Sequence, residues 1–225
     1  MEIKRVTSIL SLLLAGAAVC AAQSRPRTAC AFAYDGFATE PAEKVQIGEV
    51  APPSAVTLEA CGSPKGCILL RARRGTPVQI YRTEGDWTCG YFSSREGAGP
   101  AWIRTSDLRI LSYDTQPPLS AWDGIWAGGE DRVRIRAGVS RGTLHLTGNA
   151  RWHGANDNVH LGDIGGDAAP HGNRLHFVDG NAGSCTIDLT LLGRYILAND
   201  NDMCGGMNVH FWGIWRRVGA ARPQH

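Results

Sequence analysis

Hydrophobic and polar residues alternate in short segments along most of this chain. The alternation has a period of two residues and recurs at 78–81, 133–136, 144–147, 186–189 and 209–212. A period of two places one face of a strand in a core and the other face toward solvent. A helical period of 3.6 residues is almost absent from the sequence. The pattern therefore predicts an all-β protein built from short strands.

The segments between these strands are rich in residues that favour turns. They contain many Asn and Asp residues, and the chain as a whole has 28 glycines. Such residues are typical of the tight connections between neighbouring antiparallel strands. Short, evenly spaced strands joined in this way favour small barrels or a sandwich.

Changes in composition divide the chain into consecutive parts. Pro117 and Pro118 lie in a short polar segment between two groups of strands, where they predict a linker. After residue 22 we expect an N-terminal arm (23–43), a first β-domain (44–112), the linker (113–120), a second β-domain (121–218) and a tail (219–225).

Residues 1–22 have the three parts of a cleavable signal peptide. Lys4 and Arg5 precede an apolar run over 9–19, and Ala21 and Ala22 provide small residues for cleavage. The run is shorter than the roughly 20 residues that cross a bilayer, and no later segment is apolar for that length. The sequence predicts an exported protein, periplasmic or secreted, with no transmembrane segment in the mature chain.

The cysteines support export into an oxidising compartment. The chain has seven, of which Cys20 falls in the predicted signal peptide, so an even number remains. An even number in an exported chain predicts disulfides, although spacing alone leaves many pairings open. We favour three pairs: Cys185 with Cys204, Cys61 with Cys67, and Cys30 with Cys89.

The first β-domain carries glycine and aromatic motifs in a characteristic order. A glycine-led strand over 75–81 is followed by Trp87, by Trp102 after Gly99, and by a closing Leu108. This order resembles the bacterial SH3-like (SH3b) family over about residues 44–112. Ala101 and the extra residues 94–99 depart from the family pattern. The resemblance implies a small barrel of the kind that often binds peptidoglycan or proteins and in many cases acts as a spacer.

Four aromatic side chains of this domain are candidate ligand-binding residues: Tyr81, Trp87, Tyr91 and Trp102. In a small barrel they would lie near one another and form an aromatic groove for a peptide or a cell-wall fragment. The alternative is a purely structural role, because bulky aromatic residues supply much of the buried surface of a small barrel. Both interpretations stay open at this stage.

The second β-domain begins and ends with tryptophan motifs. Gly124 and Trp126 form a Gly-x-Trp motif near its start, and Arg216 and Arg217 lie near its end. This combination resembles the calycin group, the lipocalins and avidins, in which an Arg packs across the Trp. The resemblance implies an antiparallel up-and-down barrel of about eight strands, with a β-sandwich as the alternative. Trp126 with Arg216 or Arg217 would then make a structural cation–π contact.

The sequence offers no recognisable catalytic, cofactor or metal motif. It has no Gly-x-Ser-x-Gly, phosphate-binding or dinucleotide-binding signature. Its net charge of +2 is spread through the chain, without the dense basic stripe that nucleic-acid binding requires. The histidines lack ligand spacing. The Asn-Asp-Asn-Asp run 199–202 fails the calcium-loop pattern, because with Asp200 as position one, positions five and twelve are Cys204 and Phe211. We therefore expect no catalytic residue, no metal and no cofactor.

The function predicted from these observations is non-enzymatic binding in the cell envelope. The SH3-like module would bind peptidoglycan, a peptide or a protein, so the expected partner is a cell-wall glycan or peptide or an envelope protein. One alternative is a hydrolase with a site formed by His153, His160 and Asp200 in the second domain. The other is a small-molecule carrier that uses the mouth of the second barrel.

Overall fold

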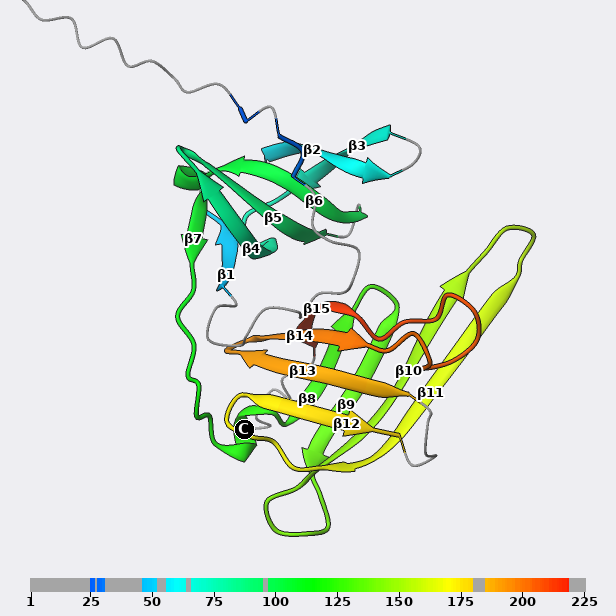
Figure 1. Cartoon of the computed structure of the whole chain (residues 1–225). Coiled ribbons are helices and arrows are strands. Elements are labelled where there is room, and N and C mark those ends of the chain that lie inside the picture. The colour runs from blue at the N-terminus through cyan, green and yellow to red at the C-terminus, as the bar shows by residue number, and fades with distance from the viewer. Residues whose placement is uncertain are drawn as a thin grey trace, which may run out of the picture.

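The computed structural model describes residues 25–26, 28–30, 46–51, 56–63, 66–94, 97–179 and 185–218. This part of the chain consists of β-strands with two short 3-10 turns, Thr105–Asp107 and Leu119–Ala121, and contains no α-helix (Figure 1). The all-β prediction is confirmed. The predicted signal peptide, the predicted tail and most of the predicted arm lie outside the described residues.

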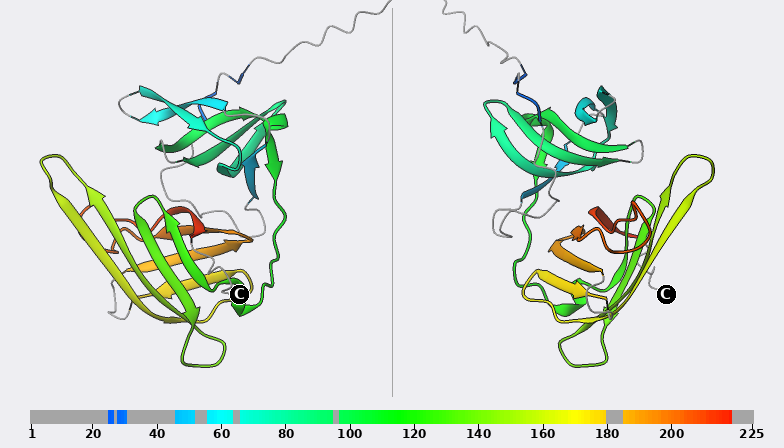
Figure 2. Two further views of the ribbon diagram at one scale, coloured as in Figure 1. Left: turned by 180° about the vertical axis from the view of Figure 1, so that it is seen from behind. Right: turned by 45° about the vertical axis from the view of Figure 1, so that its right-hand side comes forward.

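The first group of strands forms one five-stranded antiparallel sheet and a separate hairpin. The sheet has the order β6-β5-β4-β1-β7. Its strands are β1 (Gln46–Val50), β4 (Pro77–Glu84), β5 (Trp87–Ser94), β6 (Gly97–Arg104) and β7 (Leu108–Ile110). The hairpin consists of β2 (Val56–Ser63) and β3 (Gly66–Ala72), and it lies beside β6 in the views of Figures 1 and 2. Val78, Phe92 and Ile103 form the centre of this region's core.

The second group of strands forms a nearly closed antiparallel barrel with the order β11-β10-β9-β8-β15-β14-β13-β12. The strands are β8 (Gly124–Gly128), β9 (Asp131–Ala137), β10 (Leu144–His153), β11 (Val159–Ala168), β12 (Arg174–Val178), β13 (Thr186–Leu192), β14 (Tyr195–Asp200) and β15 (Gly213–Val218). The first and last strands pair, and the seam lies between β11 and β12. The prediction of an eight-stranded up-and-down barrel is confirmed over the sandwich alternative.

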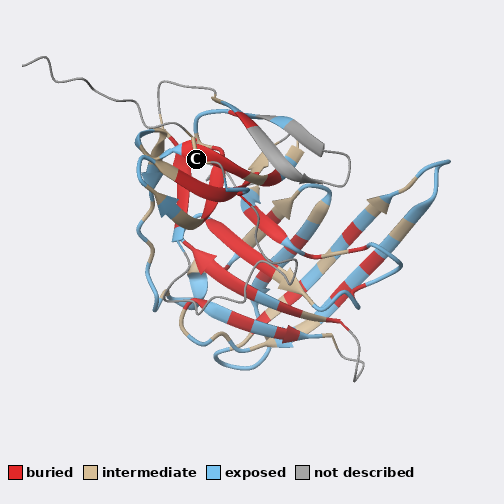
Figure 3. Cartoon of the chain, turned by 45° about the horizontal axis from the view of Figure 1, so that its top comes forward, coloured by how far each residue is buried: buried red, intermediate tan, exposed pale blue. Residues whose placement is uncertain are grey.

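The strand pattern puts large apolar side chains inside the barrel. Buried and exposed residues alternate along its strands, as the red and blue bands of Figure 3 show. Trp126, Trp215, Phe177 and Phe211 are all at most 1% exposed and belong to one core cluster. The Trp126 indole N–H donates to the Trp122 carbonyl at 2.8 Å, which satisfies its polar atom inside the core. The barrel interior is thus packed with side chains.

The predicted cation–π contact forms with Arg217 and not with Arg216. Arg217 is directly opposite Trp126 in the β15–β8 register, and its guanidinium lies 4.7 Å from the ring centroid. Successive side chains of a strand point to opposite faces, so Arg216 points away from Trp126. Its guanidinium instead donates to the Ser93 carbonyl of β5, at 3.4 Å. Of the two arginines that the sequence offered for this contact, Arg217 makes it and Arg216 does not.

Among the side chains that the structure describes, two disulfides tie loops to the sheets. Cys30 is bonded to Cys89 with a Cα separation of 5.4 Å, and Cys185 to Cys204 with a Cα separation of 4.3 Å. These are pairs that the sequence analysis favoured. The backbones of Cys61 and Cys67 are opposite one another in the β2–β3 register, but their side chains lie outside the described parts. Within the described ranges, no helix has the length and apolar character needed to cross a membrane.

Candidate functional site

The predicted aromatic groove is partly covered by the chain itself. Trp102 is only 3% exposed, packs in one cluster with Cys30 and Cys89, and donates its indole N–H to the Thr28 carbonyl at 2.9 Å. The Arg82 guanidinium lies 5.1 Å from the Trp102 ring centroid. The Cys30–Cys89 disulfide thus holds the segment around residues 28–30 over this tryptophan, and Trp102 takes a core position.

The other three groove candidates are in different environments. Trp87 is half-buried with the Arg104 guanidinium 4.9 Å from its ring centroid. Tyr81 is half-buried between the clusters, and burial strongly raises the pKa of its hydroxyl. Tyr91 is 8% exposed and packs against Ile214 of the barrel. Of the four, Tyr91 lines a cleft between the five-stranded sheet and the barrel.

This cleft has a volume of about 310 Å³ and is lined by both groups of strands. The five-stranded sheet contributes the ends of β5 and β6, including Tyr91 and Ser93. The barrel contributes residues 128–131, at the β8–β9 turn, and residues 212–214, at the start of β15. Trp212 is 40% exposed, and its ring centroid lies 6.3 Å from that of Tyr91 at an interplanar angle of 49°. Each group of strands therefore contributes one aromatic ring to the lining of the cleft.

Two neighbouring carboxylates, Glu130 and Asp131, give the cleft an acidic character. Burial raises the pKa of Asp131 to about 7, and the negative charges of Asp200 and Glu130 add to the rise. A backbone hydrogen bond from Arg151 opposes the rise without cancelling it. Exposed Glu130 lies 3.1 Å from Nε2 of His153. Asp131 consequently changes charge near neutral pH, which is unusual for an aspartate and common at functional sites.

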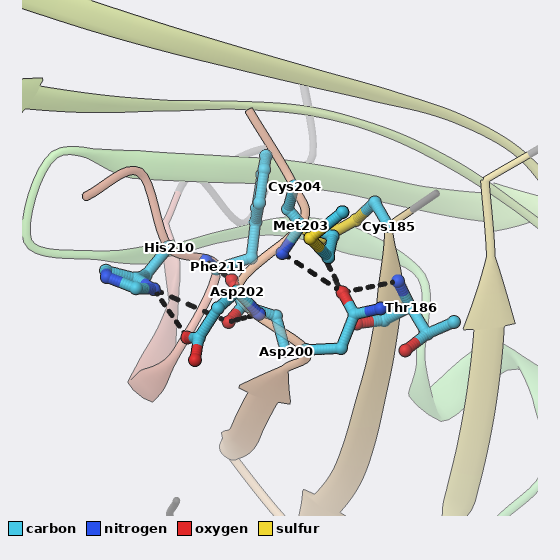
Figure 4. A network of polar contacts seen from close by, with 9 residues as sticks. Cys185, Thr186, Asp200, Asp202, Met203, Cys204, His210 and Phe211 are labelled. Carbon is cyan, nitrogen blue, oxygen red and sulfur yellow. Dashed lines mark hydrogen bonds and ion pairs between the residues drawn. A yellow bond between two sulfur atoms is a disulfide. The ribbon is translucent and has the colours of Figure 1, made fainter. Parts of the chain in front are cut away.

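The loop that carries Trp212 also brings together Asp200, Asp202 and His210, here called the His210 cluster (Figure 4). Nδ1 of His210 lies 3.1 Å from Oδ1 of Asp202 and 3.6 Å from Oδ1 of Asp200. The Asp200 side chain is 2% exposed and accepts hydrogen bonds from the backbone N–H groups of Asp202 and Phe211. The ring of His210 meets that of Trp212 edge-on, with centroids 6.0 Å apart.

A buried carboxylate lies at a second contact between the two groups of strands. Glu49 of β1 is 1% exposed and accepts hydrogen bonds from Arg109, Arg194 and Tyr195, a group called here the Glu49 cluster. Burial alone would raise the pKa of Glu49. The hydrogen bonds from Tyr195, Arg109 and Arg194 outweigh burial and leave the pKa below its ordinary value. Arg194 and Tyr195 come from the barrel, so this cluster joins β1 to the β13–β14 turn.

The three residues proposed for a hydrolase site, His153, His160 and Asp200, each have different contact partners. His153 pairs with Glu130, whereas the His160 Nδ1–H donates to the Met207 carbonyl and its ring lies 5.1 Å from that of Trp152. Asp200 belongs to the His210 cluster. These three residues therefore do not make up the unit that the alternative required.

The segment 209–212 differs from its prediction and explains why the site was missed. Its burial alternates, with Val209 and Phe211 buried and Trp212 exposed, but it is not a strand. The Phe211 N–H donates to the Asp200 carboxylate and not to a neighbouring strand. The alternation favoured a strand face, and the Asp-x-Asp spacing at 200–202 with a histidine eight residues on was the signal for the cluster.

Comparisons with protein family models, with curated proteins and with solved structures find no match for this chain. The site is therefore interpreted from its own geometry and chemistry.

Proposed function

We propose that this protein is an exported binding protein of the cell envelope whose cleft holds a peptidoglycan fragment. The observation that carries the proposal is the combination of Tyr91, Trp212 and two carboxylates in one cleft of about 310 Å³. Binding sites are usually concave, with aromatic walls and a few polar groups that fix the orientation of the ligand. This cleft has both kinds of group.

The side chains of the cleft select for the chemistry of the ligand. An ionised carboxylate only accepts hydrogen bonds, so Glu130, and Asp131 in its charged form, suit a ligand that offers hydroxyl, amide or ammonium donors. The faces of Tyr91 and Trp212 suit the apolar face of a sugar ring or a cationic group. Sugar rings, hydroxyls and peptide amino groups occur together in peptidoglycan, which therefore fits this set of contacts.

The position of the cleft modifies the role expected for the SH3-like module. In the proposal that module supplies one wall through Tyr91 and Ser93, and the barrel supplies the other through Trp212. The surface around Trp102 is less suited to a ligand because the segment held by the Cys30–Cys89 disulfide already packs there. The two disulfides also support the export step, since disulfides persist in oxidising compartments.

The packed barrel interior disfavours the carrier alternative. A carrier of this architecture holds its ligand inside the barrel, where Trp126, Trp215 and Phe211 are fully buried in this protein. Among the described residues, the cleft offers a space of about 310 Å³ outside the barrel. Binding at the cleft thus fits the packed barrel interior and the separate positions of the proposed hydrolase residues better than either alternative does.

Sedimentation with insoluble peptidoglycan tests this function. We expect the protein to co-sediment with purified peptidoglycan, and Trp212→Ala to reduce the bound fraction by about tenfold or more, because it removes a ring of the cleft. Trp152→Ala is the matched control, since Trp152 is also a partly exposed barrel tryptophan but stacks on His160 away from the cleft lining. Equal binding by the protein and both variants, or no binding at all, would overturn the proposal.

A further inference from the structure

We infer that the His210 cluster is a binding site for a divalent transition-metal ion of the zinc class. Its three ligand atoms are a carboxylate oxygen of Asp200, a carboxylate oxygen of Asp202 and Nδ1 of His210, all within 4.8 Å of one another (Figure 4). This inference is independent of the ligand proposed for the cleft.

The spacing of the atoms fits one shared ion. Zinc bonds to histidine nitrogen and carboxylate oxygen are about 2.1 Å long, which puts neighbouring ligands of a tetrahedral site about 3.4 Å apart. The distances from His210 Nδ1 to the oxygens of Asp202 and Asp200 are 3.1 and 3.6 Å. Both distances from His210 are close to that spacing, and all three atoms lie within 4.8 Å of one another.

The state of His210 is the second observation. Its Nδ1 atom is shielded from solvent and makes no hydrogen bond with any residue that the structure describes. A buried ring nitrogen without a hydrogen bond costs free energy, and such groups are rare in native proteins. Its two nearest carboxylate oxygens lie at ion-pair distance, 3.1 and 3.6 Å, and a cation bound by all three atoms would satisfy the nitrogen.

The loop fixes the ligands in advance. Asp200 is held by the backbone N–H groups of Asp202 and Phe211, and the Cys185–Cys204 disulfide ties the same loop to the start of β13. Asp131 and Glu130 add negative charge nearby, since the charges of both Asp200 and Glu130 raise the pKa of Asp131. A divalent cation would offset this concentration of negative charge.

The ligand set selects among cations. Imidazole nitrogen together with carboxylate oxygen suits zinc and its neighbours in the first transition row, whereas calcium and magnesium prefer six or more oxygens. Three protein ligands leave one position of a tetrahedral ion open to water. The site would thus resemble an open zinc site more than a closed structural one.

Isothermal titration of untagged, chelator-treated protein with zinc chloride tests the inference. We expect one ion per chain, with affinity reduced about tenfold or more in His210→Ala and in Asp202→Asn, because each removes one ligand. The Asp202 side chain is 80% exposed, so its replacement leaves the fold intact, which circular dichroism checks. His176→Ala is the matched control: His176 Nδ1 lies 2.7 Å from Asp188 in an exposed histidine–aspartate pair that lacks a third ligand.

Absence of zinc binding would overturn the inference, as would equal binding by the His210 and His176 variants or binding of calcium without zinc. X-ray absorption of the zinc-loaded protein independently identifies the atoms bound to the ion. We expect nitrogen and oxygen neighbours with one imidazole, and sulfur ligation would contradict the assignment. Because peptidoglycan is absent from both experiments, their failure is distinguishable from failure of the proposed function.

Discussion

The two groups of strands contact one another in two places, each of which contains a carboxylate. The pKa values of these two carboxylates are shifted in opposite directions. At the Glu49 cluster, three donors surround the carboxylate and its pKa falls. At the cleft, burial raises the pKa of Asp131 to about 7, and nearby carboxylates raise it further. Hydrogen bonds to the charged form stabilise it, whereas burial and like charges destabilise it. The difference suggests that the first contact holds the regions together and that the second is kept for a ligand.

The largest contrast is expected between two tryptophans at the beginning of β15. Trp215 is fully buried in the barrel core, so Trp215→Ala should lower the free energy of unfolding by about 3–5 kcal/mol. Trp212→Ala, at 40% exposure, should lower it by about 1 kcal/mol or less. Urea unfolding measures both. Similar losses from the two variants would mean that Trp212 is a core residue and that the cleft is filled by its own side chains.

The next effect concerns the Glu49 cluster. Glu49→Gln keeps the shape of the side chain but removes the charge that three donors share, so we expect a loss of about 2 kcal/mol. The figure is below that for a fully buried ion pair because Arg109 and Arg194 are more than half exposed.

Glu84→Gln is the control for this variant. Glu84 pairs with Arg82 at 2.8 Å, but both side chains are about 40% exposed, so a loss of about 0.5 kcal/mol or less is expected. If Glu49→Gln costs no more than the control in chemical unfolding, the cluster does not hold the two groups of strands together.

The contributions of Asp131 and Glu49 to stability should also depend on pH in opposite directions. The folded-state pKa of Asp131 lies above its ordinary value of 3.8, so its contribution is greatest below that pH and is lost as pH rises through about 7. The folded-state pKa of Glu49 lies below 4.5, so its contribution is present above pH 4.5 and is lost as pH falls further.

The free energy of unfolding, measured from pH 3 to pH 8 for the parent protein and for each variant, separates the two contributions. The value for each variant is subtracted from that of the parent protein at the same pH. The parent-minus-Asp131→Asn difference should change mainly between pH 3.8 and about 7, and the parent-minus-Glu49→Gln difference mainly near and below pH 4.5. A parent-minus-Asp131→Asn difference that is flat from pH 3.8 to about 7 would refute the environment described for Asp131.

The smallest effect is expected from Arg216. Its guanidinium reaches the Ser93 carbonyl at 3.4 Å from an exposed position, so Arg216→Ala should cost about 0.5 kcal/mol or less. Arg217→Ala should cost about 1 kcal/mol more, because Arg217 covers Trp126 at the end of the barrel. Thermal unfolding of the two variants measures the difference, and a larger loss from Arg216→Ala would contradict the contact between Arg217 and Trp126.

The sequence predicted those features that depend on local pattern. Alternation located strands now seen in β4, β9, β10 and β13, and the barrel followed from the number and spacing of such segments. It failed at 209–212, where alternate burial arises in a loop because the Asp200 carboxylate binds the Phe211 backbone. Local pattern does not report which polar group will satisfy a backbone N–H.

The sites were beyond prediction because they depend on contacts between distant residues. Glu49 meets Arg194 and Tyr195 from about 145 positions away, and no periodicity marks such a pair. Tyr91 was among the predicted binding residues, but its neighbour Trp212 lies in the other group of strands. The covering of Trp102 likewise depends on a disulfide to Cys30, whose position in space the spacing of cysteines does not reveal.

The most direct test is to map a bound ligand on the protein by NMR. A soluble disaccharide–peptide fragment of peptidoglycan should shift the indole resonance of Trp212 and the backbone amides of Ser93, Gly128 and Glu130, which line the cleft from both sides. We expect these shifts to saturate together, and resonances near Trp87 and Trp102 to stay unchanged. Shifts confined to Trp87 and its neighbour Arg104, with Trp212 unaffected, would contradict it.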